Sequence, residues 1–178
     1  MLVALAGCLA FAESAAAEAG KNRAEARDSF YWLDAGMGGS SFGLSGGLGL
    51  SCQTGTSIYT FRFVYSEKLE LLVSPSEAFW DVALMYGWGK WRRNRRFIGI
   101  SGGPSLAGIR RRGPKIRSNI IHAEFQKRET IIPGLAIQAQ FFLSPLRFAA
   151  IGLDLFADLN PDTSFAGILL CARVGRLR

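Results

Sequence analysis

Five charged side chains stand in segments that are otherwise built from apolar, glycine and small polar residues. Two are arginines and three are aspartates: Asp34, Arg62, Asp81, Asp154 and Arg173. Each lies on the minor face of its segment, the face that carries fewer of the large apolar side chains. An isolated buried charge costs several kcal/mol, so buried charges must be paired. If these faces meet in one interior, we predict a salt-bridge network with a structural role, and a gated ion or proton path as the alternative.

His122 is the only histidine of the chain. It lies near Ser118 and Glu124, and a histidine whose pKa is near neutrality can act as a general base. A Ser/His arrangement would suit acyl chemistry on a lipid. No G-x-S-x-G motif accompanies it. We therefore predict that the chain is not an enzyme, and the alternative is a lipid hydrolase or acyltransferase that uses His122.

Basic residues are concentrated in two segments. The formal net charge is +7, from 21 Lys and Arg against 14 Asp and Glu. One cluster consists of Arg110, Arg111, Arg112, Lys115 and Arg117; the other surrounds Trp91 and consists of Lys90, Arg92, Arg93, Arg95 and Arg96. Arginine binds phosphate through two parallel hydrogen bonds. The first cluster predicts binding of anionic head groups or of an anionic ligand, with a solvated loop as the alternative.

Regular alternation of large apolar residues with small or polar residues predicts the elements that position these groups. In the segment 80–88 one face carries Trp80, Val82, Leu84, Tyr86 and Trp88, and the other carries Asp81, Ala83, Met85 and Gly87. At about 3.3 Å per residue and a tilt of roughly 40°, a strand here spans about 20 Å of height. That is near the apolar band of a membrane barrel, with a tryptophan at each interface. Leu84 is then expected near the bilayer midplane.

The same alternation over the whole chain gives eight candidate strands, at 30–38, 42–51, 57–66, 79–89, 96–103, 131–143, 146–157 and 163–176. Phe42 is expected on the apolar face of its strand. The connections 52–56, 90–95 and 144–145 are short, whereas 67–78 and 104–130 are long. We therefore predict an all-β fold, an eight-stranded antiparallel up-and-down transmembrane β-barrel with mostly short periplasmic turns and longer external loops.

In that barrel the cluster at 110–117 emerges on the outer side. The cluster at 90–96 lies at the inner rim, with Trp91 in the membrane interface. A soluble lipocalin-like barrel, with its apolar face turned inward, is the alternative fold. It is disfavoured because glycine and serine dominate the other face of segment 42–51, and such small groups make a poor solubilising exterior but fit a narrow lumen.

The first residues predict an export signal. The run 2–12 is apolar, and the small residues at 14–17 resemble a signal-peptide cleavage site. We predict a signal peptide at 1–17, a periplasmic N-terminal segment at 18–29 and the barrel at 30–178. Acylation of Cys8, in the lipobox-like sequence Leu5-Ala6-Gly7-Cys8, is the alternative.

Cys52 and Cys171 are expected to be small apolar side chains, with a periplasmic disulfide as the alternative. The sequence has no CxxC motif or Cys/His cluster, and its Gly46–Gly49 region is not followed by the Lys and Ser or Thr of a phosphate loop. No metal site and no cofactor are therefore expected.

With its export signal, strand number, two-residue alternation and final strand 164–176, the mature chain resembles the small bacterial outer-membrane β-barrels of the OmpA and OmpX type. The resemblance implies an outer-membrane location in a Gram-negative cell envelope and a monomer of structural or binding, porin-like type. Its implied partners are outer-membrane lipids, including lipopolysaccharide phosphates, and the barrel-assembly machinery, with no nucleic acid. The chain departs from many such proteins in ending Val174-Gly175-Arg176-Leu177-Arg178, without a terminal aromatic residue.

Overall fold

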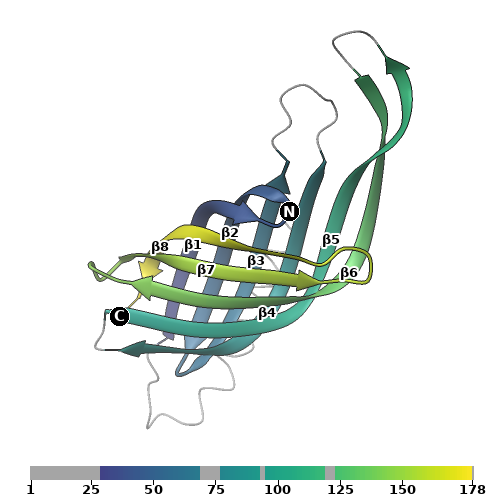
Figure 1. The fold of residues 1–178 in the computed structure, drawn as a ribbon. Helices are drawn as coiled ribbons and strands as arrows, with labels where there is room; N and C mark the ends of the chain where they lie inside the picture. The colour runs from purple at the N-terminus through teal and green to yellow at the C-terminus, as the bar shows by residue number, and fades with distance from the viewer. Residues whose placement is uncertain (1–28, 69–76, 93–94, 119–122, 178) are drawn as a thin grey trace.

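Eight antiparallel strands close into one barrel in the computed structural model, which describes residues 29–68, 77–92, 95–118 and 123–177 (Figure 1). Each strand pairs with its neighbours in the sequence, and the last pairs with the first. The strands are β1 (Ser29–Ser40), β2 (Gly43–Thr54), β3 (Ser57–Glu67), β4 (Ala78–Arg92), β5 (Arg96–Ser118), β6 (Ala123–Leu143), β7 (Ala149–Leu159) and β8 (Phe165–Arg176). The predicted all-β, up-and-down architecture is confirmed.

The largest difference from the sequence prediction concerns β5 and β6. The region 104–130 was expected to be a loop, but most of it forms a hairpin that continues both strands beyond the rim (Figure 1). Its pairing runs out to Ser118 and Ala123, with register shifts after Arg112 and after Lys115. Charged residues interrupt the apolar alternation here, because a hairpin outside the lipid needs no apolar face. Pro104 lies within β5 and pairs with Leu135, although proline is uncommon inside strands because it donates no backbone hydrogen bond.

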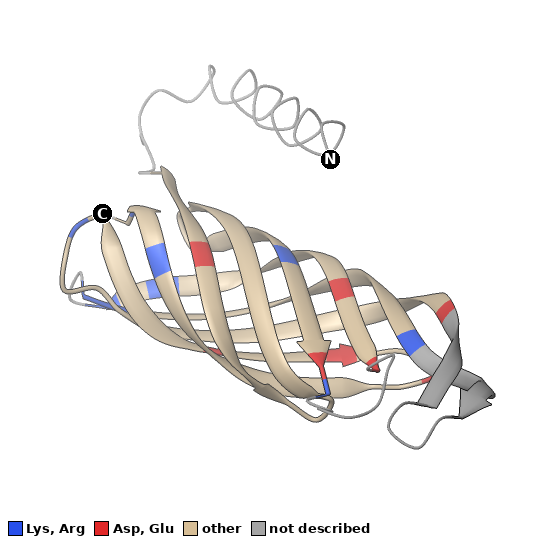
Figure 2. Cartoon of the chain, turned by 90° about the horizontal axis from the view of Figure 1, so that it is seen from above, with Lys and Arg blue, Asp and Glu red and all other residues tan. Residues whose placement is uncertain are grey.

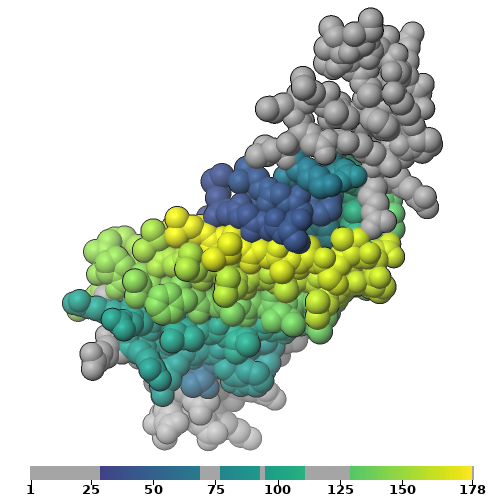
Figure 3. Space-filling view, in the orientation of Figure 1, coloured from purple at the N-terminus to yellow at the C-terminus, as the bar shows by residue number. Residues whose placement is uncertain are grey.

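The two faces of the strands differ as the alternation predicts. On β4, Leu84 and Trp88 are 59% and 61% exposed, whereas Asp81 is fully buried. Large apolar side chains on the outside of the other strands are exposed in the same way. Figure 3 shows one outer face of the barrel, where β7 and β8 (yellow-green and yellow) lie side by side. The opposite faces meet in the lumen. This arrangement is that of a membrane barrel and excludes the lipocalin-like alternative, which would bury the apolar face.

Two aromatic residues do not lie where they were expected. Phe42 is not on the lipid face, because it lies in the turn between β1 and β2. The centroid of its ring is 5.9 Å from that of Phe79, at the end of the lumen opposite Ser29 and Arg176. Strand β2 begins only at Gly43, so the alternation of the strand does not determine the direction of the Phe42 side chain. Trp91 was expected in the membrane interface, but it is half-buried, with its ring 5.0 Å from that of Phe97. Contact with the interior aromatic rings displaces it from lipid.

The turns define two ends. The end that carries the strand termini Ser29 and Arg176 also carries the tight turn at Gly55-Thr56 and the segment 144–148. Gly55 has φ of 63°, a left-handed conformation that glycine adopts without strain. The β5–β6 hairpin rises from the opposite end. We call these the terminal end and the hairpin end. No helix among the described residues is long and apolar enough to cross a membrane.

The position of Leu84 gives a first test. Leu84→Arg places a cation on the lipid face near mid-height, where it should destabilise the folded barrel by about 2–4 kcal/mol in bilayers. Leu44, which pairs with Glu67 next to a rim, provides the control, because Leu44→Arg should cost about 0–1 kcal/mol. Denaturant titrations in lipid vesicles would measure both. Equal costs for the two variants would contradict the assigned depth of Leu84.

Candidate functional site

Arg173 occupies the lumen near the terminal end and is fully buried. It is the register partner of Asp34 across the β1–β8 seam, and its Nε donates to Asp34 Oδ1 at 2.7 Å while Nη2 donates to Oδ2 at 3.2 Å. Trp32 Nε1 donates to the same carboxylate at 3.1 Å. The pair is therefore bidentate and is held by a third group.

Aromatic rings enclose this arginine. The guanidinium carbon of Arg173 lies 3.7 Å from the ring centroid of Phe142, 4.4 Å from Trp32 and 4.7 Å from Phe97. Cations are attracted to the faces of such rings, and more strongly where water is excluded. The guanidinium group of Arg173 thus occupies the lumen near the terminal end, and it links β8 to β1, β5 and β6 through these ring contacts.

Arg62 extends across the middle of the lumen. From β3 its Nη2 donates to Asp81 Oδ2 on β4 at 2.5 Å, and its Nη1 donates to the backbone oxygen of Ile137 on β6 at 3.3 Å. Its guanidinium carbon lies 5.5 Å from the ring of Phe156 on β7. Both Arg62 and Asp81 are buried, at 2% and 0% exposure. One side chain therefore contacts three other strands.

Asp154 has an amide as its direct partner. Gln138 Nε2 on β6 donates to Asp154 Oδ2 on β7. Several polar atoms of this layer have no protein partner among the described residues, including Arg62 Nε, Asp81 Oδ1, Ser105 Oγ and Asp154 Oδ1. A layer of this polarity is suited to internal water.

Asp158 is a buried charge that the sequence prediction did not include. It is fully buried on β7, and its Oδ1 accepts a hydrogen bond from Asn160 Nδ2 at 3.1 Å. The signal was present in the alternation, because Asp158 continues the inward row of Asp154 and Phe156. The predicted strand ended at 157, one residue before it.

An aromatic layer lies across the lumen at the hairpin end. The ring centroids of Phe79 and Phe165 are 3.8 Å apart, and those of Phe156 and Phe165 are 5.6 Å apart. Phe79 is fully buried, and Phe156 and Phe165 are each 3% exposed. Side chains from β4, β7 and β8 therefore meet above the charged layer.

The predicted outer cluster lies on the β5–β6 hairpin rather than on a loop. Arg110 Nε donates to Glu129 Oε1 at 2.9 Å, and both side chains are exposed. Further out, the backbone register pairs Arg111 with Arg128, Arg112 with Lys127, Lys115 with Phe125, and Arg117 with Glu124. The side chains of these outer residues are outside the described part of the structure, as is all of His122.

The terminal end carries only cations at its surface in the described residues. Its exposed charged side chains are Lys90, Arg92, Arg95, Arg96, Arg147 and Arg176. Figure 2 shows blue segments in the turns at the end of the barrel where the chain terminates. Arg93, which was assigned to the same cluster, lies outside the described residues. The opposite rim has mixed charges, among them the ion pair of Lys68 with Glu77 at 2.7 Å.

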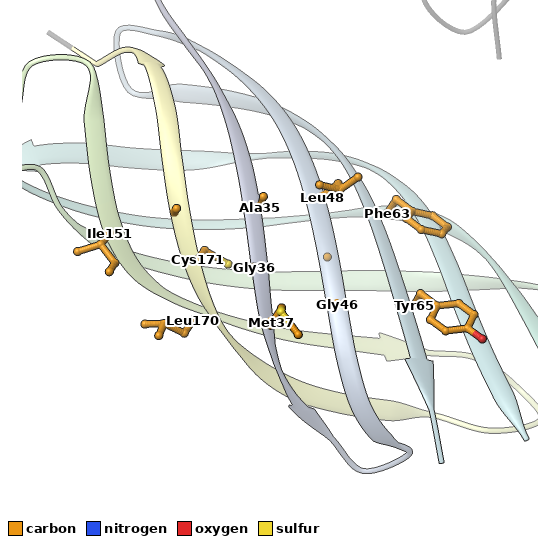
Figure 4. Close-up of a pocket in the computed structure, with 12 residues that line it drawn as sticks. Ala35, Gly36, Met37, Gly46, Leu48, Phe63, Tyr65, Ile151, Leu170 and Cys171 are labelled. Carbon is orange, nitrogen blue, oxygen red and sulfur yellow. The ribbon is translucent and has the colours of Figure 1, made fainter. Parts of the chain in front are cut away.

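A shallow groove of 610 Å³ lies on the outer surface and extends from the β1–β8 seam over β2 and β3 (Figure 4). Its lining is apolar and includes Ala35, Met37, Leu48, Ile151, Leu170 and Ala172. Cys171 lines it from the interior side, where the thiol is buried, and Cys52 is exposed. Both cysteines are free, so the alternative of a disulfide is excluded.

Solved structures share this fold. The N-terminal β-barrel domain of Pseudomonas aeruginosa OprF aligns with a TM-score of 0.60 and 10% identity, over 84% of this chain and 98% of that chain. Ail, the attachment invasion locus protein of Yersinia pestis, aligns with a TM-score of 0.55 and 11% identity, over 83% and 96%. Neisserial surface protein A aligns with a TM-score of 0.54 and 8% identity, over 82% and 96%.

Ail is also similar in its complex with the heparin analogue sucrose octasulfate, at a TM-score of 0.54 and 13% identity over 83% of this chain and 96% of that chain. No protein-family model and no curated protein matches the chain. The fold is that of the small outer-membrane barrels of the OmpA and OmpX type. The predicted fold, an eight-stranded membrane barrel, is confirmed by these structures together with the apolar exterior.

The Arg173–Asp34 pair gives a second prediction. Arg173→Gln leaves the Asp34 carboxylate buried without its cation, and we expect a loss of about 3–5 kcal/mol of unfolding free energy. Asp34→Asn alone leaves the arginine uncompensated and should cost a similar amount. The double variant should be more stable than the sum of the two losses predicts, because no unpaired charge remains. Urea unfolding in lipid measures the cycle, and strictly additive losses would contradict a direct coupling.

Proposed function

We propose that the chain is a non-enzymatic outer-membrane protein of binding type, in which the barrel is a membrane anchor and the β5–β6 hairpin binds anionic groups. The ligand chemistry is sulfate or phosphate, carried by a polysaccharide or by lipopolysaccharide. The binding residues are Arg110, Arg111, Arg112, Lys115 and Arg117. The terminal end faces the periplasm, as the short turns of such barrels do. The hairpin then lies outside the cell.

The observation that carries this proposal is the register of the hairpin. Arg111 stands opposite Arg128, and Arg112 stands opposite Lys127. Like charges directly opposed in an antiparallel pair destabilise it. A bound anion between such strands removes that repulsion, and arginines suit the oxygens of sulfate and phosphate. The complex of Ail with sucrose octasulfate shows that a protein of this fold binds a sulfated ligand.

The interior supports the role of an anchor. Asp34, Arg62, Asp81, Asp154 and Arg173 lie in the lumen, and none is more than 5% exposed. Eight-stranded barrels leave an interior that side chains can fill. We propose that this charged, filled lumen serves stability rather than transport.

This role predicts silence in planar bilayers. The folded protein should give no discrete conductance steps. The aromatic layer at the hairpin end, the side chain of Arg62 and the rings around Arg173 all lie across its lumen. Arg62→Ala, which removes the cross-lumen contacts, serves as the comparison. Discrete steps in the wild type that change amplitude in Arg62→Ala would establish the narrow ion channel in place of a filled anchor.

We also propose roles for residues that lie outside the described part of the structure and for the partners of the chain. Residues 1–17 would act as a signal peptide and 18–29 as a periplasmic segment, and Cys8 would be removed with the signal. The barrel would insert as a monomer through the barrel-assembly machinery. Expression of the protein should leave lipid A and phospholipids unmodified. A modification that disappears in His122→Ala would instead establish a lipid-modifying enzyme.

A charge-matched pair of variants tests the hairpin. In one variant Arg111, Arg112, Lys115 and Arg117 are replaced by Gln. In the control Lys90, Arg92, Arg95 and Arg96 are replaced by Gln, which removes the same charge from the terminal end. Binding of a heparin oligosaccharide and of lipid A to the refolded protein should fall roughly tenfold or more in the first variant only.

The two ligands distinguish the two sources of anionic groups. Loss of heparin binding alone assigns a sulfated polysaccharide, and loss of lipid A binding alone assigns lipopolysaccharide. Equal losses in both variants would show that net charge, and not the hairpin, determines binding, and would overturn the proposal.

A further inference from the structure

The seam between β1 and β8 presents two parallel rows of lipid-facing side chains. On β8 the row is Arg176, Val174, Ala172 and Leu170, and on β1 it is Tyr31, Leu33, Ala35 and Met37. The register places these side chains opposite one another in that order, from Tyr31 with Arg176 to Met37 with Leu170. A polar pair at the terminal rim is therefore followed by apolar pairs deeper in the membrane.

The groove crosses these rows and extends from them over β2 and β3, where Leu48 and Phe63 line it. Ala35 and Ala172 are register partners, and their short side chains form a floor between the longer side chains of Met37, Leu48 and Ile151 (Figure 4). Ala172 is four residues from Arg176, or about 13 Å along the strand. The apolar core of a leaflet is about 15 Å deep. The groove thus lies at the depth of the acyl chains of the leaflet whose head groups meet Arg176.

A second cation joins the polar end of the rows. Gly175 N–H donates to the backbone oxygen of Phe148 at 2.9 Å, and Arg147 precedes Phe148 in the turn between β6 and β7. Continuation of this register brings Arg147 to the rim position next to Arg176. Both arginines are exposed, as is Tyr31 at 58%. Two guanidinium groups and a phenol thus stand where a phosphate would lie.

We propose that this seam binds one anionic phospholipid of the leaflet at the terminal end. Its phosphate contacts Arg176 and Arg147, Tyr31 lies at the level of the head group, and one acyl chain lies in the groove over Ala35 and Ala172. The two arginines favour an anionic head group. The apolar side chains that follow them along the same rows can contact the acyl chain of the same lipid. The site is independent of the β5–β6 hairpin, which lies at the opposite end.

The experiment measures lipids retained on the full protein. The protein is refolded into nanodiscs of equimolar phosphatidylglycerol and phosphatidylcholine, released, and weighed with bound lipid by native mass spectrometry. We expect retention of phosphatidylglycerol in preference to phosphatidylcholine. Arg176→Gln and Arg147→Gln should each reduce this preference about fivefold. Ala172→Phe, which fills the groove, should reduce the amount of retained lipid.

Two matched variants and a second groove variant complete the design. Arg95→Gln removes an exposed arginine elsewhere on the same end, and Ala139→Phe adds the same bulk to the outward face of β6 away from the groove; both should behave as the wild type. Heat-modifiable gel migration confirms folding, and Ala35→Leu replaces Ala172→Phe if the latter does not fold. Equal retention of the two lipids by the wild type would overturn the proposal. Equal effects of the seam variants and of their matched controls would overturn it too. Neither outcome depends on whether the β5–β6 hairpin binds a ligand.

Discussion

Hydrocarbon offers no hydrogen-bond partner to the backbone, and the rest of this structure depends on that constraint. A strand in lipid must have every N–H and C=O group bonded to a neighbouring strand, so the sheet has to close. The pairing of β1 with β8 provides that closure. Closure in turn gives every strand one face toward lipid and one toward a narrow lumen. The alternation in the sequence follows from this division.

Charged side chains in the lumen are removed from water, so they require partners inside the protein. Four buried aspartates and two buried arginines occur among the described residues. Arg173 and Arg62 each bind one carboxylate, and Asp154 and Asp158 bind amide groups of Gln138 and Asn160. The position of Arg173 is notable because Asp34 is its direct register partner across the seam. The ion pair that compensates the buried charge of Asp34 therefore also joins the closing pair of strands.

The sequence predicted the features that depend on this lipid constraint and missed those that do not. Strand number, strand direction and the inward placement of Asp34 and Arg62 follow from alternation, because a single shift of register would turn every side chain to the wrong face. The hairpin beyond the rim has no lipid face, so its strands carry no such pattern. Phe42 and Trp91 were misplaced because packing on interior rings decides their direction. Contacts such as that of Arg62 with the backbone of Ile137 join opposite walls, and no local pattern encodes them.

The two ends of the barrel differ in a way that follows from what each must meet. At the hairpin end, Lys68 and Arg110 are paired with Glu77 and Glu129, and Glu67 and Asp162 add acidic groups to the same rim. The other basic residues of the cluster, Arg111, Arg112, Lys115 and Arg117, lie further out along the hairpin. At the terminal end, the exposed charges of the described residues are all positive, and Lys90 and Arg176 directly follow the outward-facing Trp88 and Val174 on their strands. A cation at the edge of the belt can reach lipid phosphates, whereas a cation far beyond it can reach only a ligand in solution or on a surface polymer. The position of each charge relative to the belt, more than the net charge of +7, therefore separates the lipid contact that we propose at one end from the ligand binding that we propose at the other.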